Sequence, residues 1–175
     1  MRQVTLITTG GTIEKTYDEQ TGELSNRRTL VDRMLAELHL EETAISTVEL
    51  MSKDSLDMTP EDRRRILEAV RSATDNDAAS SGVVVLHGTD TLCETGELLA
   101  RELPSPRVPV VLTGAWRPFE MKRSDALQNL TEAIFATGAL QPGVYCVAHG
   151  RPLRFPGVRK DRERGTFTAG GEAAR

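Results

Sequence analysis

Short apolar runs alternate with longer segments of helical periodicity along the chain. The runs are rich in β-branched residues and cover residues 4–8, 45–51, 83–86, 108–113 and 144–148. Strict alternation of strands and helices is typical of a parallel sheet with right-handed crossovers. The pattern therefore predicts one doubly wound, three-layer α/β domain of the Rossmann or flavodoxin type, with a mainly parallel five-stranded sheet.

Helical patterns connect these strands and begin at recognisable capping residues. They cover about 29–40, a segment from residue 59, a segment from residue 91, and 124–138. Thr29 is a candidate N-cap, and Thr59 precedes Pro60, which favours the first helical position. Thr91 and Glu94 have the spacing of a capping box, in which each side chain accepts from the other residue's backbone N–H.

Residues 14–28 break the alternation. They are mostly polar or charged, with Tyr17 and Leu24 as the only sizeable apolar or aromatic side chains, and residues 18–22 predict a hairpin turn. Long connections inside compact domains are usually lids or binding loops. We therefore expect a lid loop at about 13–28 in a domain of residues 1–165, followed by a frayed tail at 166–175.

Two glycine-and-threonine turns directly follow apolar strands, at 8–12 (TTGGT) and 87–91 (HGTDT). Ligands bind at the carboxyl ends of strands in open parallel sheets, and glycine lets the backbone approach a ligand closely. Polar segments at 53–55, 113–115 and 149–151 follow the other strands. We expect all five segments to converge on one active site. The turns are not phosphate loops, because GxxxxGK[ST] and GxGxxG are absent from the sequence.

Composition narrows the class of protein. The 175 residues carry a formal net charge of −4 and a pI of about 5.5, which disfavours a nucleic-acid partner, since such domains are normally basic. The sequence shows no signal segment and no run of ~18 apolar residues, so we expect a soluble, cytoplasmic protein without a membrane partner. Cys93 and Cys146 lie in apolar stretches and are expected to be free thiols, which suits a reducing compartment.

Single residues in these segments carry weak signals. The three histidines lack the spacing of metal ligands, so no metal or cofactor is expected. Thr12 alone is more typical of a strand-end turn than of a nucleophile, and Asp90 equally suits a helix cap. Lys160 lies among arginines and fits a solvated basic patch. Only the ordered set of segments favours catalysis.

Taken in order, the segments resemble the bacterial-type L-asparaginases, the threonine-dependent amidohydrolases. The matching segments are 9–13 (TGGTI), 54–60 (DSLDMTP), 87–91 (HGTDT), 113–118 (TGAWRP), 124–125 (SD), 129–130 (NL) and Lys160. The resemblance covers almost the whole chain, and the ordered set is highly specific. Typical members carry a second, smaller α/β domain, so we expect this chain to correspond to their first domain only.

The resemblance implies catalytic roles for five residues. Thr12 is the implied nucleophile that forms an acyl-enzyme, and Tyr17 is implied to orient or deprotonate it when the loop closes. Thr89 is implied to hold the hydrolytic water, supported by Asp90 and Lys160. A threonine hydroxyl is a poor nucleophile until a neighbouring base takes its proton. Because a nearby carboxylate favours the charged form of a lysine, we expect Lys160 to organise the site electrostatically and shuttle a proton, rather than act as a free-standing base.

The resemblance also implies substrate contacts. Ser55 is similar to the serine that binds the substrate α-carboxylate, Asp90 to the acid that meets the α-amino group, and Ala115 to the residue whose carbonyl contacts the leaving amide. The expected substrate-binding residues are Gly11, Asp54, Ser55, Gly88 and Ala115.

Two further features of the expected site concern the oxyanion and the substrate amino group. The backbone N–H groups of Thr12 and Thr89 are our candidate oxyanion donors. In long relatives, a glutamate from a partner's second domain helps to bind the amino group. Asp54, Glu14 and Glu120 are candidates to replace it.

The implied activity is hydrolysis of L-asparagine, a small-molecule substrate, to L-aspartate and ammonia. Two alternatives stay open: a related amidohydrolase acting on glutamine or another amide, and a non-catalytic module that binds asparagine or aspartate. Two-fold dimers are the commonest soluble oligomers, so we expect a homodimer, with a tetramer as the alternative.

Overall fold

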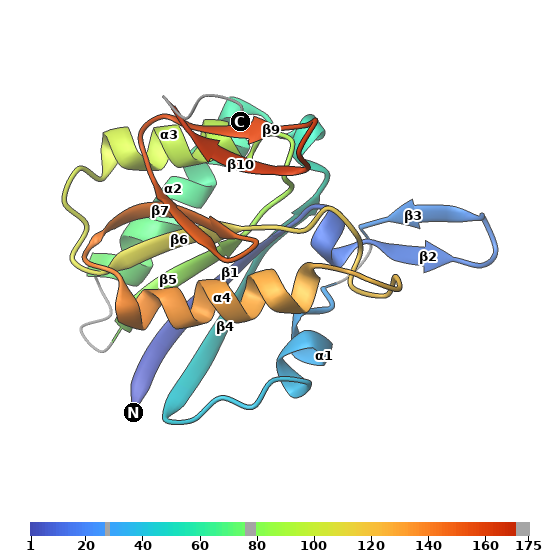
Figure 1. Cartoon of the computed structure of the whole chain (residues 1–175), viewed down its shortest axis with the longest axis horizontal. Helices are drawn as coiled ribbons and strands as arrows, with labels where there is room; N and C mark the ends of the chain where they lie inside the picture. The colour runs from blue at the N-terminus through green and yellow to red at the C-terminus, as the bar shows by residue number, and fades with distance from the viewer. Residues whose placement is uncertain (27–28, 76–79, 171–175) are drawn as a thin grey trace.

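A mainly parallel sheet forms the centre of the molecule. The computed structural model describes residues 1–26, 29–75 and 80–170. Within these ranges the central sheet has six strands in the order β4-β1-β5-β6-β7-β8 (Figure 1). Neighbouring strands from β4 to β7 are parallel, as predicted, and β8 adds an antiparallel edge strand that the sequence did not predict. The strands are β1 (Arg2–Gly10), β4 (Thr43–Lys53), β5 (Ser80–Leu86), β6 (Pro109–Thr113), β7 (Gly143–Ala148) and β8 (Arg151–Arg154).

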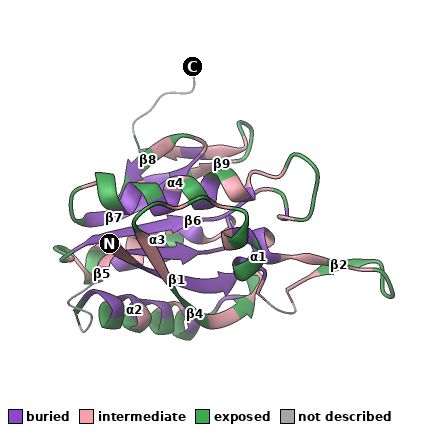
Figure 2. Ribbon diagram, turned by 90° about the horizontal axis from the view of Figure 1, so that it is seen from below, coloured by how far each residue is buried: buried purple, intermediate pink, exposed green. Residues whose placement is uncertain are grey.

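Helices cover both faces of this sheet. They are α1 (Val31–Ala36), α2 (Pro60–Asp75), α3 (Leu92–Glu102) and α4 (Ala126–Ala139). Side chains of α2 and α3 share one apolar cluster with the sheet, whereas α1 and α4 share the other. Figure 2 shows the buried strands between these layers and the exposed residues on the outer helix surfaces. The structure confirms the predicted three-layer α/β class.

The strand order determines where a ligand site can form. Numbered by their order along the chain, the five parallel strands are arranged 2-1-3-4-5, which is the flavodoxin-like order. The order reverses between β1 and β5, and ligands bind outside the carboxyl ends of the strands at such a switch point. Thr8 of β1 lies beside Leu86 of β5. The two glycine turns that follow these strands therefore begin next to each other.

A hairpin beyond the central sheet completes one apolar layer. It consists of β9 (Val158–Asp161) and β10 (Thr166–Ala169), which pair antiparallel. Phe155 and Phe167 are buried in the cluster that includes α2 and α3, and this burial explains why the hairpin is ordered. The structure differs here from the expected frayed tail at 166–175, because its first four residues form β10. Residues 171–175 lie outside the described residues.

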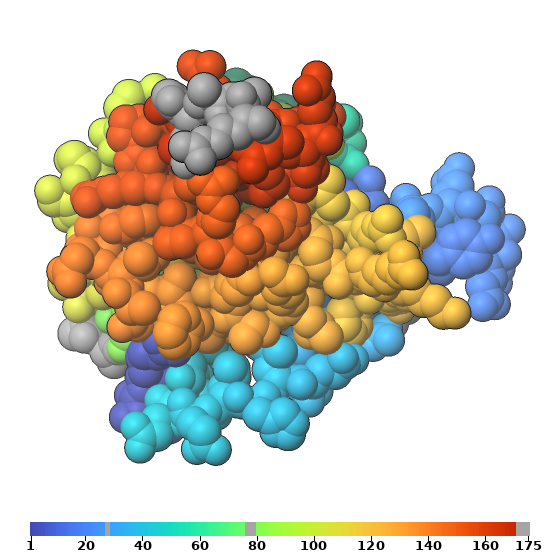
Figure 3. Space-filling model, viewed as in Figure 1, coloured from blue at the N-terminus to red at the C-terminus, as the bar shows by residue number. Residues whose placement is uncertain are grey.

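A second hairpin occupies the segment expected to form a lid. A short 3₁₀ helix (Thr12–Glu14) leads into β2 (Thr16–Asp18) and β3 (Glu23–Ser25), with the predicted turn at the tip. Figures 1 and 3 show this hairpin projecting from the body of the molecule. Tyr17 and Leu24 line one pocket together with Pro118 and Met121. Residues 27–28, part of the expected lid, lie outside the described residues.

The two threonines predicted to cap helices have different outcomes. The N-cap of α1 is Leu30 and not Thr29, which lies one residue earlier and accepts from the Val31 N–H (3.2 Å). At α2, the Asp62 N–H donates to Thr59 Oγ1 (3.2 Å), and the Thr59 N–H donates to Asp62 Oδ2 (2.9 Å). These reciprocal bonds explain why α2 begins at Pro60.

None of the helices among the described residues has the length and apolar character needed to cross a membrane. Cys93 and Cys146 are free thiols, as predicted.

Gly96 lets the ring of Phe155 pack directly on α3, and a Cβ atom at this position would overlap that ring. Alanine is otherwise the better helix former by about 1 kcal/mol. We expect Gly96→Ala to lower the free energy of unfolding by about 1–3 kcal/mol because of the overlap, as measured by urea denaturation.

Gly138 on α4 provides a matched control, because a Cβ atom there meets only the flexible end of the Arg2 side chain. Gly138→Ala should leave stability unchanged or raise it by up to about 1 kcal/mol. Equal effects of the two substitutions would contradict the packing argument.

Candidate active site

The two glycine turns are in backbone contact at the switch point. Gly11 has a φ of +78°, and a Cβ atom on it would lie 2.5 Å from the Cα atom of Gly88. Only glycine allows this approach and this backbone conformation together. The residues that follow, Thr12 and Thr89, therefore leave the sheet from touching turns. The structure thus brings together the two threonines that the sequence selects.

Ser55 joins the same contact from the end of β4. A Cβ atom on Gly88 would lie 2.5 Å from Ser55 Oγ, and Ser55 is buried at the start of a short 3₁₀ helix (Ser55–Asp57). Thr91 Oγ1 donates to the Ser55 carbonyl (2.9 Å). The capping box predicted for Thr91 and Glu94 is therefore wrong, because the Thr91 hydroxyl bonds to Ser55 and Glu94 pairs with Arg63 at 2.7 Å.

A threonine–lysine–aspartate group adjoins the Gly11–Gly88 contact, because Thr89 and Asp90 directly follow Gly88. Lys160 Nζ, on β9, donates to Thr89 Oγ1 (2.7 Å) and to Asp90 Oδ1 (3.0 Å). Lys160 is not part of a solvated basic patch, because its side chain is only 13% exposed and its ammonium lies 5.2 Å from the ring centre of Trp116. Arg162 Nη2 also donates to Asp90 Oδ1 (2.7 Å). No pattern in the sequence marks Arg162 for this contact.

The charge on Asp90 is stabilised by these two cations. Burial alone would raise the pKa of the Asp90 carboxyl, but hydrogen bonds and charge interactions with Lys160 and Arg162 outweigh it and hold the pKa below its ordinary value. Lys160 Nζ donates to the Thr89 oxygen, which leaves the Thr89 hydroxyl proton free to point elsewhere.

A buried histidine fixes the peptide that precedes Thr89. His87 is completely buried, and burial lowers its pKa from 6.5 to about 4, so the ring is neutral at pH 7. Its Nδ1 lies 2.9 Å from the Gly88 carbonyl oxygen and its Nε2 lies 2.8 Å from Thr95 Oγ1. Since a carbonyl oxygen only accepts, Nδ1 carries the proton and Nε2 accepts from Thr95.

This arrangement orients the Thr89 N–H. In a trans peptide the carbonyl and the following N–H point in opposite directions, and the Gly88–Thr89 bond is trans. Because the Gly88 carbonyl points toward the buried imidazole, the Thr89 N–H points away from it. Among the described residues the Thr89 N–H has no hydrogen-bond acceptor, although Thr89 is only 5% exposed. A nearly buried donor without an acceptor is suited to binding a ligand oxygen.

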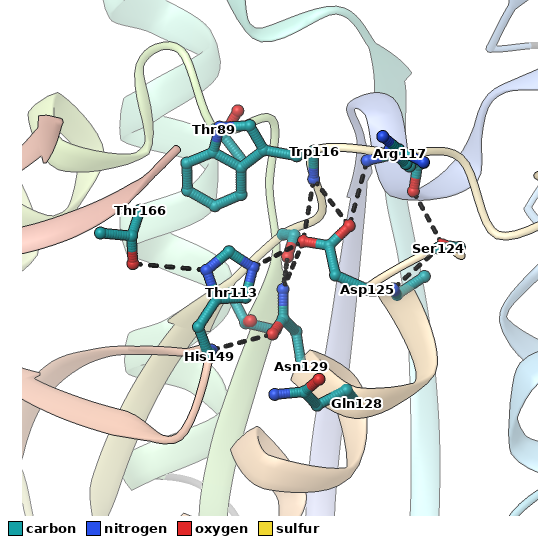
Figure 4. A network of polar contacts seen from close by, with 12 residues as sticks. Thr89, Thr113, Trp116, Arg117, Ser124, Asp125, Gln128, Asn129, His149 and Thr166 are labelled. Atoms are coloured by element: carbon teal, nitrogen blue, oxygen red, sulfur yellow. Dashed lines mark hydrogen bonds and ion pairs between the residues drawn. The ribbon is translucent and has the colours of Figure 1, made fainter. Parts of the chain in front are cut away.

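The loop that carries Ala115 is held from below by α4 (Figure 4). Asp125 accepts from the backbone N–H groups of Trp116 and Arg117, with distances of 3.1 Å. Asn129 Nδ2 donates to the Gly114 carbonyl (2.8 Å) and to Asp125 Oδ2 (3.0 Å). Burial alone would raise the pKa of Asp125, but hydrogen bonds from His149 and from the backbone N–H groups of Trp116 and Arg117 outweigh it and lower the pKa. The Ala115 peptide is therefore anchored on both sides.

His149 connects this loop to the β9–β10 hairpin (Figure 4). Its Nε2 lies 2.9 Å from Asp125 Oδ2, and its Nδ1 lies 3.3 Å from Thr166 Oγ1 on β10. The ring centre of Trp116 lies 5.0 Å from that of His149 and 5.0 Å from that of Phe167. The motif match included Asp125 and Asn129 but gave no role to either. His149 lies in one of the five predicted strand-end segments, but the sequence gave no role to its side chain.

The remaining predicted residues lie around this centre. Thr12 opens the 3₁₀ helix after Gly11, whereas Tyr17 is 58% exposed on the projecting hairpin, so a catalytic role for Tyr17 stays a prediction. Asp54 pairs with Lys15, and Glu120 pairs with Arg33. Glu14 is buried and accepts from the Gly10 N–H (3.0 Å); burial raises its pKa. In the described part of the chain, no three His, Cys, Asp or Glu side chains are grouped to hold a metal ion.

Comparison with known proteins identifies relatives over most of the chain. The family model described as "Asparaginase, N-terminal" matches residues 3–169. The chain is 32% identical over 151 residues to a glutamyl-tRNA(Gln) amidotransferase subunit of Methanococcus vannielii, covering 86% of this chain and 35% of that protein. It is 39% identical over 101 residues to an L-asparaginase of Thermococcus kodakarensis, covering 58% and 30% of the two chains.

A solved structure supports the same relationship. The thermostable L-asparaginase from Thermococcus kodakarensis superposes with a TM-score of 0.83 at 29% identity, covering 95% of this chain and 51% of that chain. The chain thus spans about a third of the length of the first curated relative and about half of this structure.

Substitution of Asp125 should loosen the Ala115 loop. Asp125→Asn places an NH₂ group among donors from Trp116, Asn129 and His149, and at least one buried donor then loses its acceptor. We expect the free energy of unfolding at pH 7 to fall by about 1–3 kcal/mol, measured by urea denaturation. Asp57 is exposed on the surface, so Asp57→Asn serves as the control. It should change the free energy of unfolding by less than about 0.5 kcal/mol. Similar losses in both variants would contradict the proposed anchoring.

The low pKa of His87 makes folding stability depend on pH. Between pH 6.5 and 4 the unfolded chain binds a proton at His87 that the folded protein does not, so stability falls as pH falls through this window. From pH 7 to pH 4.5 we expect wild type to lose roughly 2–3 kcal/mol more than His87→Asn, measured by urea denaturation at both values. A difference between the two proteins that does not vary with pH would contradict a buried neutral imidazole.

Proposed function

The chain belongs to the asparaginase family, whose N-terminal domain it matches, and we propose that it hydrolyses the side-chain amide of L-asparagine to L-aspartate and ammonia. Family membership supports amidohydrolase activity. The observation that carries the finer proposal is the Thr89–Lys160–Asp90 group, with Nζ–O distances of 2.7 and 3.0 Å. Thr12 directly follows Gly11, which is in backbone contact with Gly88, the residue before Thr89.

In the proposed first step, Thr12 Oγ attacks the amide carbon and the carbonyl oxygen becomes an oxyanion. The threonine proton passes to the amide nitrogen, the C–N bond breaks, and ammonia leaves behind an ester between Thr12 and the acyl group. The N–H groups of Thr12 and Thr89 are the proposed oxyanion donors. A donor of this kind contributes roughly 3–4 kcal/mol in comparable sites. Tyr17, carried on the hairpin after Thr12, is proposed to orient or deprotonate the nucleophile when the hairpin closes.

In the proposed second step, a water held by Thr89 attacks the ester. The Lys160 ammonium donates to the Thr89 oxygen, so the Thr89 hydroxyl proton and the Asp90 charge remain available to position the water. The C–O bond to Thr12 then breaks, and Thr12 regains its proton. Lys160 acts as the electrostatic organiser of this step, because its Nζ donates to both Thr89 and Asp90.

The remaining residues of the proposed site bind the substrate. The Ala115 carbonyl, on the loop anchored by Asp125, is the proposed acceptor for the substrate's amide NH₂ group. Ser55 is the proposed donor to the α-carboxylate, with Asp54 beside it, and the Gly11–Gly88 contact forms the floor.

A second candidate is an amidohydrolase that acts on glutamine or another amide, with protein partners. The relatives named as glutamyl-tRNA(Gln) amidotransferase subunits, at 30–34% identity over about 85% of this chain, favour it. A pure binding module is the third candidate. For the chain itself we propose a cytoplasmic homodimer without a nucleic-acid or membrane partner.

Ammonia release from L-asparagine and L-glutamine tests the proposal. We expect wild type to act on asparagine, and Thr12→Ala and Thr89→Val to lower kcat by about 10³-fold or more, because both hydroxyls act in the reaction itself. Thr131→Ala removes an exposed hydroxyl on α4 that bonds only within its helix, and this control should retain full activity.

Near-normal turnover by Thr12→Ala would overturn the nucleophile assignment. A clear preference for glutamine would favour the second candidate. Binding of asparagine without any product would favour the third.

A further inference from the structure

Three glycine carbonyls around the proposed site are each held by a side-chain donor. The pairs are Gly11 with Asn26 (2.8 Å), Gly88 with His87 (2.9 Å) and Gly114 with Asn129 (2.8 Å). Each of these glycines directly precedes a residue with a proposed role: Thr12, Thr89 and Ala115. Neither the motif segments nor the proposed reaction includes Asn26, so its hydrogen bond is the unexplained member of the set.

The local backbone alone does not fix the orientation of the Gly11–Thr12 peptide. Gly10 and Gly11 both have positive φ values, +97° and +78°, so two consecutive residues without a Cβ atom lead into Thr12. On the glycine side, no Cβ atom opposes rotation of this peptide plane. Contacts from outside the turn must therefore select the direction in which the Thr12 N–H points.

The Gly11 carbonyl accepts two hydrogen bonds. The Glu14 N–H donates at 3.2 Å within the 3₁₀ helix, and Asn26 Nδ2 donates at 2.8 Å. The Asn26 bond is the stronger of the two, because 3.2 Å is the long limit for an N–H···O bond. The peptide is trans, so the Thr12 N–H points away from this carbonyl. Among the residues that the structure describes, the Thr12 N–H has no acceptor and is available to a ligand oxygen.

Asn26 lies at the base of the projecting hairpin (Figure 1). It directly follows β3, whose partner β2 begins four residues after Thr12. The bond from Asn26 to Gly11 spans 15 positions and thus closes the hairpin onto the turn from which it starts. Glu14 adds a second connection, because it accepts from the Gly10 N–H (3.0 Å) and from Thr29 Oγ1. Both ends of the hairpin are therefore tied to the two glycines.

We propose that Asn26 is a positioning residue that, through the Gly11 carbonyl, orients the Thr12 N–H toward the oxyanion formed in the first step. His87 orients the Thr89 N–H through the Gly88 carbonyl in the same way. The assignment of Asn26 rests on the proposed function and deepens it. Because His87 is buried at the end of β5 whereas Asn26 follows β3, only the Thr12 donor depends on the position of the hairpin.

A role of this kind affects catalysis and not ground-state binding. The charge on the carbonyl oxygen develops only in the transition state, so a misdirected donor lowers kcat and leaves substrate affinity nearly unchanged. Removing one oxyanion donor lowers kcat by about 10²–10³-fold in comparable sites. Loss of the Asn26 side chain should cost less, because the Glu14 N–H still donates to the Gly11 carbonyl.

Asn26→Leu removes the donor and keeps a side chain of similar shape. We expect kcat for L-asparagine to fall by about 10–100-fold, while KM and the dissociation constant of L-aspartate change by less than about 3-fold, measured by ammonia release and titration calorimetry.

Gln128→Leu is the matched control, because the exposed Gln128 amide also donates at 2.8 Å, to Glu132 on α4. This variant should keep kcat within about 2-fold of wild type. Unchanged kcat in Asn26→Leu would overturn the proposal. Equal losses of kcat and of L-aspartate affinity would also overturn it and indicate a merely structural hydrogen bond.

Crystal structures of wild type and Asn26→Leu separate this proposal from the proposed function. We expect the Gly11 carbonyl to face Asn26 in wild type, and the Gly11–Thr12 peptide to adopt two orientations in the variant. An unchanged peptide in the variant would overturn the positioning role even if wild type hydrolyses asparagine. If the peptide turns in the variant but wild type releases no ammonia, the hydrolysis is overturned and the control of the Thr12 N–H by Asn26 is supported.

Discussion

The contact between Gly11 and Gly88 is the constraint on which the site depends. Two strands, β1 and β5, end side by side at the switch point, and their turns can touch only because neither carries a Cβ atom there. Ser55 occupies the space that a side chain on Gly88 would need. The segments that contain Gly11, Ser55 and Gly88 are more than 30 residues apart in the sequence, and these contacts fix their backbones relative to one another. The relative positions of the Thr12 and Thr89 segments are therefore set by the backbone.

The two aspartates of the candidate site, Asp90 and Asp54, are paired with different numbers of cations. Asp90 is held between Lys160 and Arg162, whereas Asp54 has one cation. The first arrangement is buried on its lysine side and suits a fixed electrostatic task, because rearranging it would leave an unpaired charge in low dielectric. The second is partly exposed and can open at little cost. The two aspartates therefore differ in the number of cations that they face, two for Asp90 and one for Asp54.

Local sequence patterns predicted the parallel strands and the strand-end residues because both are marked by apolar runs and by the turns that end them. Strands β8 (RPLR) and β9 (VRKD) carry charged residues, and β10 (TFTA) has one large apolar side chain, so none of them shows such an apolar run. They are ordered by Phe155 and Phe167, whose burial depends on tertiary packing. The Thr91 capping box failed for the same reason, since Ser55, 36 residues away, takes its hydroxyl. The supporting roles of His87 and His149 likewise depend on contacts that no local pattern contains.

Trp116 makes the two sides of the site interdependent. Its backbone N–H is held by Asp125, next to the Ala115 carbonyl, while its ring contacts Lys160, His149 and Phe167. The loop beside the proposed leaving group and the hairpin that positions Lys160 therefore rest on one side chain. Because packed aromatic contacts of this kind resist small displacements, a shift of the β9–β10 hairpin would move the Ala115 loop as well. The β9–β10 hairpin is thus as much a part of the candidate site as the glycine turns that follow β1 and β5.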